Sequence, residues 1–450
     1  MSYVPNTPEE QQAMLADMGL STIEDLLKTV PADIRLHSLL DLPPARSEPE
    51  LRRHLSAMAK RNANHDDAPS FLGAGTYEHA IPSVVPHLRN RSEFVTSYTP
   101  YQPEVSQGML QAIYEFQTMV CQITGMDIAN ASLYDGSTAL VEAALLALGP
   151  GGRGEIVISS GVDPQYRRVL HTYAFARGFT IKEVPTHNGV TSLEALNEAV
   201  TPTTAAVMIQ QPNFFGCIED MYAIEPIAHK GKALFVTTIT EPASLGILAA
   251  PGSYNADIAV GELMSFGNPM SYGAPALGFM ATKQKFMRLL PGRLVGQTEE
   301  EGEQKQIGYV LTLQTREQHI RRERATSNIC TNQSLLAVGA TIFLAAMGKQ
   351  GFQEMSKLCV QKAHYAGSQI TAVRGFSSVF SSPFFDEFVI KTPIPAQQLE
   401  PYFERARIIG GYPLGAHYAD MEDCMLFCVT ETRTKEDIDR LVDVLKEVHA

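Results

Sequence analysis

The sequence predicts an α/β protein with a large domain built on a mostly parallel sheet and a smaller α+β domain after it. Strands rich in β-branched residues alternate with helices between residues 155 and 238, which is typical of βαβ units. These strands are apolar on both faces, so helices should cover both sides of the sheet. A chain of 450 residues is long enough for two or three domains.

Residues 1–65 are expected to form a helical arm. The run Thr7-Pro8-Glu9-Glu10 offers a capping threonine, a proline at the first helical position and a glutamate three residues after the cap. Ser21 through Glu24 repeats this capping pattern, and a charged helix is expected over residues 48–62. Such caps fix helix boundaries and carry no information on function.

Residues 66–331 are expected to form the large domain. Glycine-bearing turns and a change of hydrophobic period separate its elements. The run 297–306 is acidic and lacks an apolar period, which predicts a surface hairpin or loop. The predicted helices cover residues 102–124, 138–148, 164–177 and 192–200, and the predicted strands cover residues 155–158, 179–184, 205–209 and 233–238.

Residues 332–450 are expected to form a bridging helix and the small α+β domain. The bridging helix should cover residues 332–349, and residues 424–429 have the composition of a buried strand. Thr434 is expected to cap a terminal helix. Its apolar stripe comprises Ile438, Leu441, Val442 and Leu445.

The composition excludes several classes of function. With 36 basic and 49 acidic residues the net charge is −13, which argues against a nucleic-acid or anionic-membrane partner. We find no signal peptide and no run of 18 apolar residues, so we expect no membrane span and a cytoplasmic location. The six cysteines show no metal-ligand spacing, so we expect reduced thiols and no metal site.

The turn Ser132–Ala139 opens a predicted helix and could bind an anion, because free N–H groups point outward at a helix N-terminus. Asp135 can itself satisfy these groups, and its carboxylate would repel a phosphate. We therefore favour helix capping by Asp135 over phosphate binding.

Two other segments are dense in polar and aromatic side chains. Tyr98–Glu104 is stiffened by proline, and it is either a rigid turn before a helix or a wall of an active site. Gln314–Asn328 carries four arginines and a histidine. It is either an ion-paired helix, or an anion-binding patch or subunit contact.

These residues closely resemble the P-protein family of the glycine cleavage system, in its subunit 1 form, over essentially the whole chain. That form corresponds to the N-terminal half of the single-chain glycine dehydrogenase (decarboxylating). The matching strings are Tyr98–Glu104, Ser106–Gly108, Asn130–Gly136, Leu290–Gly296 and Leu313–Thr331.

The resemblance implies a type I fold dependent on pyridoxal 5′-phosphate (PLP). The family reaction decarboxylates glycine on PLP and passes the aminomethyl group to the lipoyl arm of the H-protein. In the two-subunit form the Schiff-base lysine belongs to subunit 2, which agrees with the absence of lysine from Ala256–Gly267. Lys283 and Lys285 have the wrong spacing, and Glu241 is a poor substitute for the aspartate that PLP enzymes place after the preceding strand.

We therefore expect this chain to hold no PLP and to complete the pocket of a partner that does. The resemblance suggests two copies of each subunit. Two alternatives stay open at this point: a self-sufficient PLP-dependent lyase or aminotransferase, and a non-catalytic regulatory scaffold. The residues expected to reach the partner's pocket are Tyr98, Tyr101, Thr326, Ser327 and Asn328, and those expected to shape the interface are Arg316, His319, Arg321 and Arg322.

Overall fold

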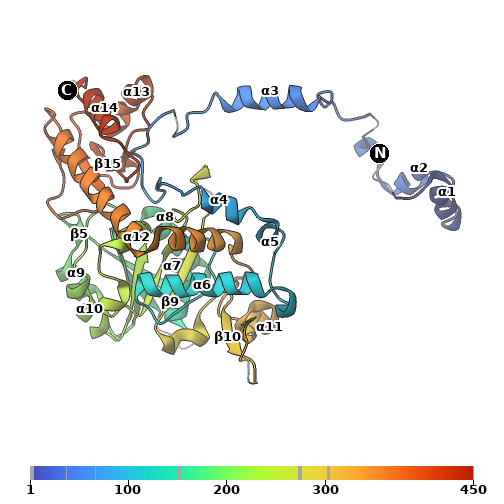
Figure 1. Cartoon of the computed structure of the whole chain (residues 1–450), viewed down its shortest axis with the longest axis horizontal. Helices are drawn as coiled ribbons and strands as arrows, with labels where there is room; N and C mark the ends of the chain where they lie inside the picture. Colours follow the sequence, from blue (N-terminus) through green and yellow to red (C-terminus); the bar gives the residue numbers. More distant parts are fainter. Residues whose placement is uncertain are drawn as a thin grey trace. The chain divides into compact units, whose positions relative to one another are not determined.

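The chain divides into two compact units, residues 1–62 and 63–450 (Figure 1). The structure is a computed structural model that describes residues 5–36, 38–65, 67–149, 154–271, 276–301 and 305–448. The expected boundary at residue 66 lies outside the described residues. The further division near residue 331 stays a prediction.

The described residues of the first unit form three short α-helices and no apolar core. Thr7 and Glu10 form the predicted capping box of the first helix. The second box pairs Thr22 with Asp25, so the predicted pair of Ser21 and Glu24 is wrong by one residue. Leu15 is the one buried side chain among the described residues of this unit. The helices are α1 (Pro8–Asp17), α2 (Ile23–Leu26) and α3 (Glu48–Ala59).

The second unit is built on a seven-stranded sheet in the order β1-β9-β8-β7-β6-β2-β3. Five neighbouring strands, β3, β2, β6, β7 and β8, are parallel, which confirms the predicted sheet, and β9 runs antiparallel beside β8. The strands are β1 (Ile128–Ala129), β2 (Glu155–Ser159), β3 (Thr180–Val184), β6 (Thr204–Gln210), β7 (Leu234–Ile239), β8 (Ile258–Glu262) and β9 (Gly278–Thr282).

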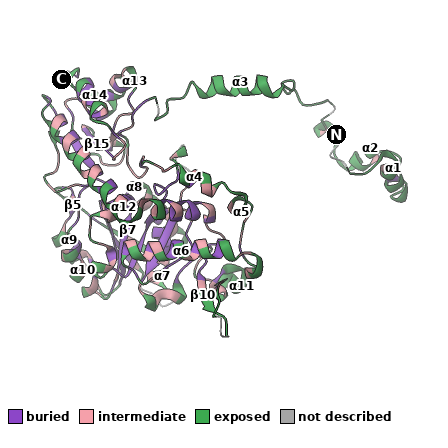
Figure 2. Cartoon of the chain, viewed as in Figure 1, coloured by how far each residue is buried: buried purple, intermediate pink, exposed green. Residues whose placement is uncertain are grey.

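Helices cover both faces of this sheet, and the buried residues concentrate in its central strands (Figure 2). The hydrophobic helix α7 packs against β6, β7, β8 and β9, which places it over the middle of the sheet. The helices of this region are α4 (Val84–Arg89), α5 (Ser92–Val95), α6 (Gln107–Thr124), α7 (Gly136–Leu148), α8 (Pro164–Arg177), α9 (Leu193–Ala199), α10 (Met221–Lys230) and α11 (Gln318–Arg321).

Two hairpins and a second sheet complete the unit. The predicted acidic hairpin is formed by β10 (Val295–Glu299) and β11 (Ile307–Leu311), which pair antiparallel. Residues 302–304 lie outside the described residues. The short hairpin pairs β4 (Thr186–His187) with β5 (Val190–Thr191). The second sheet is antiparallel. Side chains of α13 (Glu400–Arg405) and α14 (Lys435–Lys446) share a hydrophobic core with its strands. Its strands are β12 (Ser377–Ser378), β13 (Glu387–Lys391), β15 (Cys424–Cys428) and β14 (Tyr412–Pro413).

Helix α12 (Ser334–Thr371) joins the two sheets. It consists of two helical parts that meet at Gly348, whose φ of 60° and ψ of 178° are not helical. The predicted end at residue 349 therefore matches the end of its first part. By length and composition α12 could cross a membrane, but it packs against α4, α6 and α14 as a core helix of this unit.

Candidate functional site

The carboxyl ends of the parallel strands form one edge of the large sheet, where open α/β sheets bind their ligands. The N-terminus of α7 meets this edge beside the end of β8. Gly136, the first residue of α7, donates its N–H to Glu262 Oε2 at 3.2 Å, and Glu262 is the last residue of β8. We refer to this part of the molecule as the crevice.

Carboxylates of the chain itself accept hydrogen bonds from the free backbone N–H groups at the N-terminus of α7. Asp135 accepts the N–H of Thr138 at 2.9 Å, which confirms the predicted cap. Glu262 also accepts the N–H groups of Met264 and Leu277. Burial, with Asp135 nearby, raises the pKa of Glu262 to about 7. A phosphate dianion would face two acidic side chains here, so the helix end does not fit the phosphate of PLP.

The same helix end has no room for a larger residue at its first position. A Cβ atom added to Gly136 would lie 2.0 Å from the hydroxyl of Tyr166 and 2.9 Å from the carbonyl carbon of Gly261. Helix α7 therefore lies directly against β8 and against the side chain of Tyr166, with no gap into which a cofactor could enter at this position.

The lysines that follow β9 lie at the opposite edge of the sheet. Lys283 donates to Asp257 Oδ1 at 2.9 Å, and Lys285 lies 3.2 Å from the same oxygen. Asp257 precedes β8, so these amines lie at its amino end, away from the crevice. Since Ala256–Gly267 contains no lysine, the crevice fits neither the phosphate nor the covalent anchor of PLP.

A buried polar network continues along the crevice. Gln210, at the end of β6, donates to Thr240 Oγ1 at 3.0 Å. Tyr77 donates to Glu387 Oε2 at 2.9 Å, and the N–H of Ala74 donates to Glu387 Oε1 at 2.7 Å. Burial raises the pKa of Glu387 above its ordinary value.

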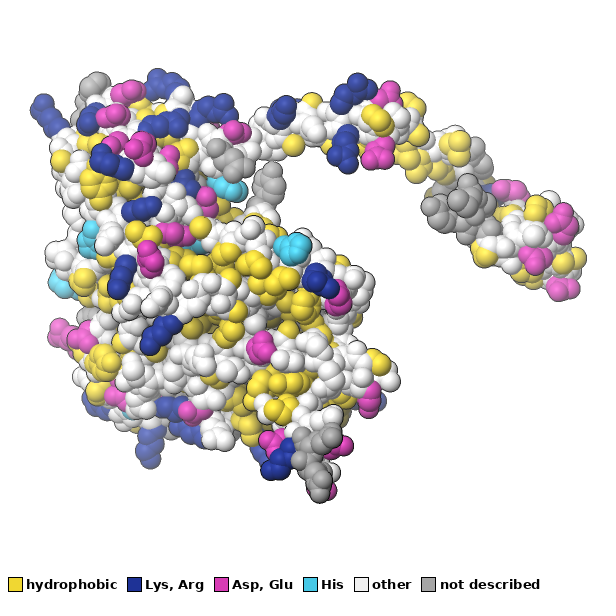
Figure 3. All heavy atoms as spheres, viewed as in Figure 1, with side chains coloured by type: hydrophobic (Ala, Val, Ile, Leu, Met, Phe, Trp, Pro, Cys, Tyr) yellow, Lys and Arg dark blue, Asp and Glu magenta, His cyan; other side chains and the backbone are white. Residues whose placement is uncertain are grey.

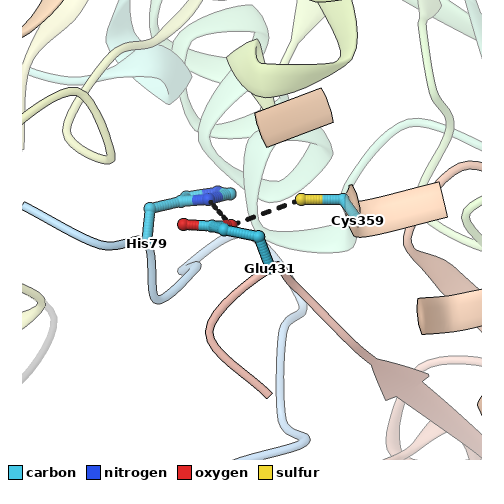
Figure 4. Close-up of side chains that lie close together, drawn as sticks. All are labelled: His79, Cys359 and Glu431. Carbon is cyan, nitrogen blue, oxygen red and sulfur yellow. Dashed lines mark hydrogen bonds and ion pairs between the residues drawn. The ribbon is translucent and has the colours of Figure 1, made fainter. Parts of the chain in front are cut away.

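His79 lies between the buried carboxylate of Glu241 and the partly buried carboxylate of Glu431. Figure 4 shows His79 with Glu431 and the neighbouring Cys359. Its Nδ1 is 2.7 Å from Glu431 Oε2, and its Nε2 is 3.2 Å from Glu241 Oε2. Burial opposes a charge on His79, but the two carboxylates outweigh it and raise the pKa of His79 well above its ordinary value. The imidazolium thus links the segment before α4, the end of β7 and the end of β15.

Cys359 completes this cluster, with its Sγ 3.4 Å from Glu431 Oε2. His79, Cys359 and Glu431 are of the kinds that bind metal ions, and their donor atoms lie within 4.8 Å of one another. Both imidazole nitrogens already face carboxylates, and the separations are those of hydrogen bonds. The arrangement is therefore better explained as a buried ion-paired cluster than as a metal site.

A second region brings together the strings that carry the family resemblance, and Arg293 lies at its centre. Arg293 donates to Tyr101, to the carbonyl of Cys330 and to Asn332. Its own carbonyl accepts the N–H of Ala131 at 2.9 Å. Segments 98–104, 130–136, 290–296 and 313–332 thus meet around one residue, and we call the surface that they form the Arg293 face.

The two predicted tyrosines lie on this face. Tyr98 is 81% exposed, and Tyr101 is 52% exposed with its hydroxyl 3.1 Å from Arg293 Nη2. The ring of Tyr101 also contacts His319 edge-on, with the ring centres 6.5 Å apart. Tyr98 is therefore exposed on this face, whereas Tyr101 is half exposed and its hydroxyl lies beside the buried guanidinium of Arg293.

The predicted interface residues have different surroundings. Arg316 is partly buried and donates to the carbonyls of Leu290, Gly292 and Leu313, so it holds the neighbouring loop in place. Arg321 donates to the carbonyl of Thr315, and His319 lies 3.5 Å from Glu317. Arg322 is exposed and has a positive φ of 53°. A continuous ion-paired helix is wrong here, because only Gln318–Arg321 is α-helical.

The loop Thr326–Asn328 borders this segment. Thr326 and Asn328 are exposed, whereas Ser327 accepts the N–H of Ile329 at 3.1 Å and contacts the buried Glu142. Burial raises the pKa of Glu142 to about 7. Thr326 and Ser327 also line a pocket with Arg288, Arg321 and Arg324. Their role in a partner's pocket stays a prediction.

Sequence reasoning missed four residues that organise these two regions: Glu262, His79, Glu431 and Arg293. A signal existed for Glu262, since it is a lone acid in an otherwise apolar strand. Arg293 lies within the string Leu290–Gly296, which drew attention only as a resemblance. His79 and Glu431 are 352 residues apart and carry no local signal of their pairing.

Comparison with known proteins agrees with this architecture. The family model described as glycine cleavage system P-protein matches residues 1–445. The probable glycine dehydrogenase (decarboxylating) subunit 1 of Geobacillus kaustophilus is 50% identical over 448 residues, which cover 100% of this chain and 99% of that relative.

Solved structures have the same fold. A crystal structure of glycine decarboxylase (P-protein) of the glycine cleavage system, in inhibitor-bound form, matches with a TM-score of 0.88 and 42% identity, covering 99% of this chain and 100% of that one. The sphingosine-1-phosphate lyase of Burkholderia pseudomallei has the same fold at 14% identity, with a TM-score of 0.68 and coverage of 93% and 94%. The predicted type I fold of PLP-dependent enzymes is confirmed, and the chain belongs to the glycine cleavage system P-protein family.

Proposed function

We propose that this chain is subunit 1 of a heteromeric glycine decarboxylase and completes the active site of a second subunit. The observation that carries the proposal is the closed crevice. The N–H groups at the start of α7 are already hydrogen-bonded to the carboxylates of Glu262 and Asp135. The segment Ala256–Gly267, which contains β8, has no lysine. A subunit without its own cofactor site contributes to catalysis by supplying groups to a neighbour.

The Arg293 face is the surface that supplies these groups. Bound PLP, held by the partner subunit, would supply the electron sink for decarboxylation of glycine. Tyr98 and Tyr101 would place hydroxyl groups at the edge of the partner's pocket, and rigid placement of such groups favours reaction. Thr326, Ser327 and Asn328 would add short polar side chains to the same wall, and Arg316, His319, Arg321 and Arg322 would shape the contact.

The partners in this proposal are subunit 2, the lipoylated H-protein and glycine. Subunit 2 would join this chain in an assembly with two copies of each, in the cytoplasm. Hydrophobic side chains gather over α6 and α12 on one face of the second unit (Figure 3). An apolar groove lined by Met119, Ile123, Leu344 and Phe352 lies there, and burial of such a groove would favour subunit association.

The test is glycine–CO₂ exchange with this chain alone, with subunit 2 alone and with both together. We expect exchange only from the mixture, and a PLP absorbance band that borohydride fixes to subunit 2. Covalent PLP on this chain alone would instead favour a self-sufficient enzyme. Exchange by subunit 2 alone at the rate of the mixture would favour a regulatory scaffold.

A further inference from the structure

Arg293 is a buried arginine whose hydrogen-bond partners are all neutral. Its side chain is buried, and the whole residue is 5% exposed. Nη1 donates to Asn332 Oδ1 at 3.0 Å and to Thr331 Oγ1 at 3.4 Å. Nη2 donates to the Cys330 carbonyl at 2.8 Å and to the Tyr101 hydroxyl at 3.1 Å. Nε is buried and has no hydrogen-bond partner among the described residues.

Arg433 provides a matched comparison, since it is also 5% exposed. Arg433 lies 2.6 Å from the carboxylate of Glu78, which compensates its charge. Arg293 forms no ion pair with any acidic residue that the structure describes. Proteins bury charges with a counter-ion because desolvation is otherwise unfavourable. An uncompensated cation at this position indicates that its charge and geometry serve a group outside the chain.

Among the described side chains that accept a hydrogen bond from Arg293, Tyr101 is the exposed one. Arg293 Nη2 donates to the tyrosine oxygen, and the guanidinium also lies 5.3 Å from the centre of the tyrosine ring. A phenol oxygen that accepts one hydrogen bond still carries its own hydrogen. Because the ring is half exposed, that hydrogen can be donated away from Arg293, toward a group that approaches the face.

We propose that Arg293 is a positioning residue that fixes Tyr101 as a hydrogen-bond donor toward the partner subunit's pocket. The inference deepens the proposed function and rests on it. Arg293 holds the loop 330–332 and the segment 98–101 with the two ends of one planar guanidinium. The tyrosine hydroxyl therefore has a fixed position and a fixed donor direction. The group that it meets is an acceptor, such as a carboxylate or a phosphate oxygen.

The test is a double-mutant cycle in the reconstituted complex with the variants Tyr101→Phe and Arg293→Lys. Tyr101→Phe removes the outward donor, and we expect kcat/KM for glycine to fall about tenfold, as for the loss of one hydrogen bond to a charged group. Arg293→Lys keeps the charge but loses the planar fork. We expect it to cause a similar fall alone and less than a twofold further fall in the Tyr101→Phe background.

Readouts besides turnover separate positioning from loss of structure. The thermal unfolding of the free chain should stay unchanged in Tyr101→Phe, and Arg293→Lys should unfold at a lower temperature but remain folded under the assay conditions, because it loses hydrogen bonds of a buried side chain. Association with subunit 2 and the PLP absorbance of the complex should stay unchanged in both variants. Arg433→Lys is the matched control, with the same burial but no place on the Arg293 face, and it should leave kcat/KM unchanged.

Three results would overturn the inference. Multiplicative effects of about a hundredfold in the double variant would show that Arg293 acts independently of Tyr101. An unchanged kcat/KM in Tyr101→Phe would remove the donor role, and loss of subunit association in Arg293→Lys would assign Arg293 a structural role. If unmodified subunit 2 proves active without this chain, the proposed function fails first, and that result is separate from all three.

Discussion

The crevice and the Arg293 face use polar side chains in opposite ways. In the crevice, Glu262, Asp135 and Glu387 accept hydrogen bonds from neighbouring groups of the same chain. On the Arg293 face, Tyr98 is exposed, and Tyr101 is half exposed with its hydroxyl beside Arg293. Arg293 carries a charge that no described carboxylate compensates. Polar groups that are hydrogen-bonded within the chain support the fold. Polar groups without such partners are available to the partner subunit of the proposed function.

The strongest test of the closed crevice is the variant His79→Ala. It would leave Glu241 and Glu431 buried without the imidazolium that they share, at a cost of about 3–5 kcal/mol in the free energy of unfolding. Urea unfolding at neutral pH measures this quantity. The exposed His87→Ala is the control and should change it by less than about 0.5 kcal/mol. A loss below about 1 kcal/mol for His79→Ala would show that the cluster is not ion-paired.

The variant Gly136→Ala tests how tightly α7 lies against β8. The added Cβ would overlap the Tyr166 hydroxyl, and such overpacking costs about 1–3 kcal/mol. Combining it with Tyr166→Phe should recover part of that loss. Gly154→Ala is the control, because a Cβ there meets nothing within 4 Å. Equal stability of Gly136→Ala and the unmodified chain would indicate free space at the helix end.

The dependence of stability on pH tests whether Glu262 is protonated in the folded chain. Its folded pKa of about 7 lies above its ordinary value of 4.5, so the folded chain keeps a proton that the unfolded chain releases. Stability should therefore fall as pH rises from about 5 to about 7, by on the order of 1–3 kcal/mol from this residue. The stabilisation from His79 is present at acidic pH and is lost only as pH rises through its raised pKa.

Thermal unfolding of Glu262→Gln across this range isolates the contribution of Glu262. Glutamine cannot ionise, so we expect a flatter slope between about pH 5 and pH 7 than in the unmodified chain. An unchanged slope would mean that Glu262 is already ionised in the folded chain.

The variant Tyr98→Phe tests the Arg293 face. Because Tyr98 is 81% exposed and has no hydrogen bond within the described residues, its loss should change the free energy of unfolding by less than about 0.5 kcal/mol. We expect about a tenfold lower exchange rate in the reconstituted complex. Tyr222→Phe, at an exposed tyrosine on α10 whose hydroxyl lies 3.4 Å from Ser253 Oγ, is the control for the exchange rate. An unchanged rate in Tyr98→Phe would remove it from the proposed site.

Local signals were sufficient to predict most of the large sheet and its helices. Helix α8 begins and ends at the predicted residues, because Pro164 occupies its first position and Gly178 adopts the left-handed conformation at its end. The cap at Asp135 was predictable for the same reason. These features depend on neighbours within a few residues along the chain.

Features that depend on distant contacts were not predictable from the sequence. The antiparallel β9 lies between β1 and β8, although β1 precedes it by about 150 residues. The link of His79 to Glu241 and Glu431 joins three separate segments. The missing lysine was visible in the sequence, but the fact that Glu262 occupies the helix end in place of an external anion required coordinates.

The carboxylate of Glu262 at the start of α7 has a consequence for how this lineage can change. A lysine placed near Met264 would supply an amine, but Glu262 and Asp135 would still accept the N–H groups of the helix end, and Tyr166 would still lie against Gly136. Several simultaneous substitutions would be needed before any of them brought an advantage. Under the proposed function, a single substitution would therefore not give this chain a cofactor site of its own.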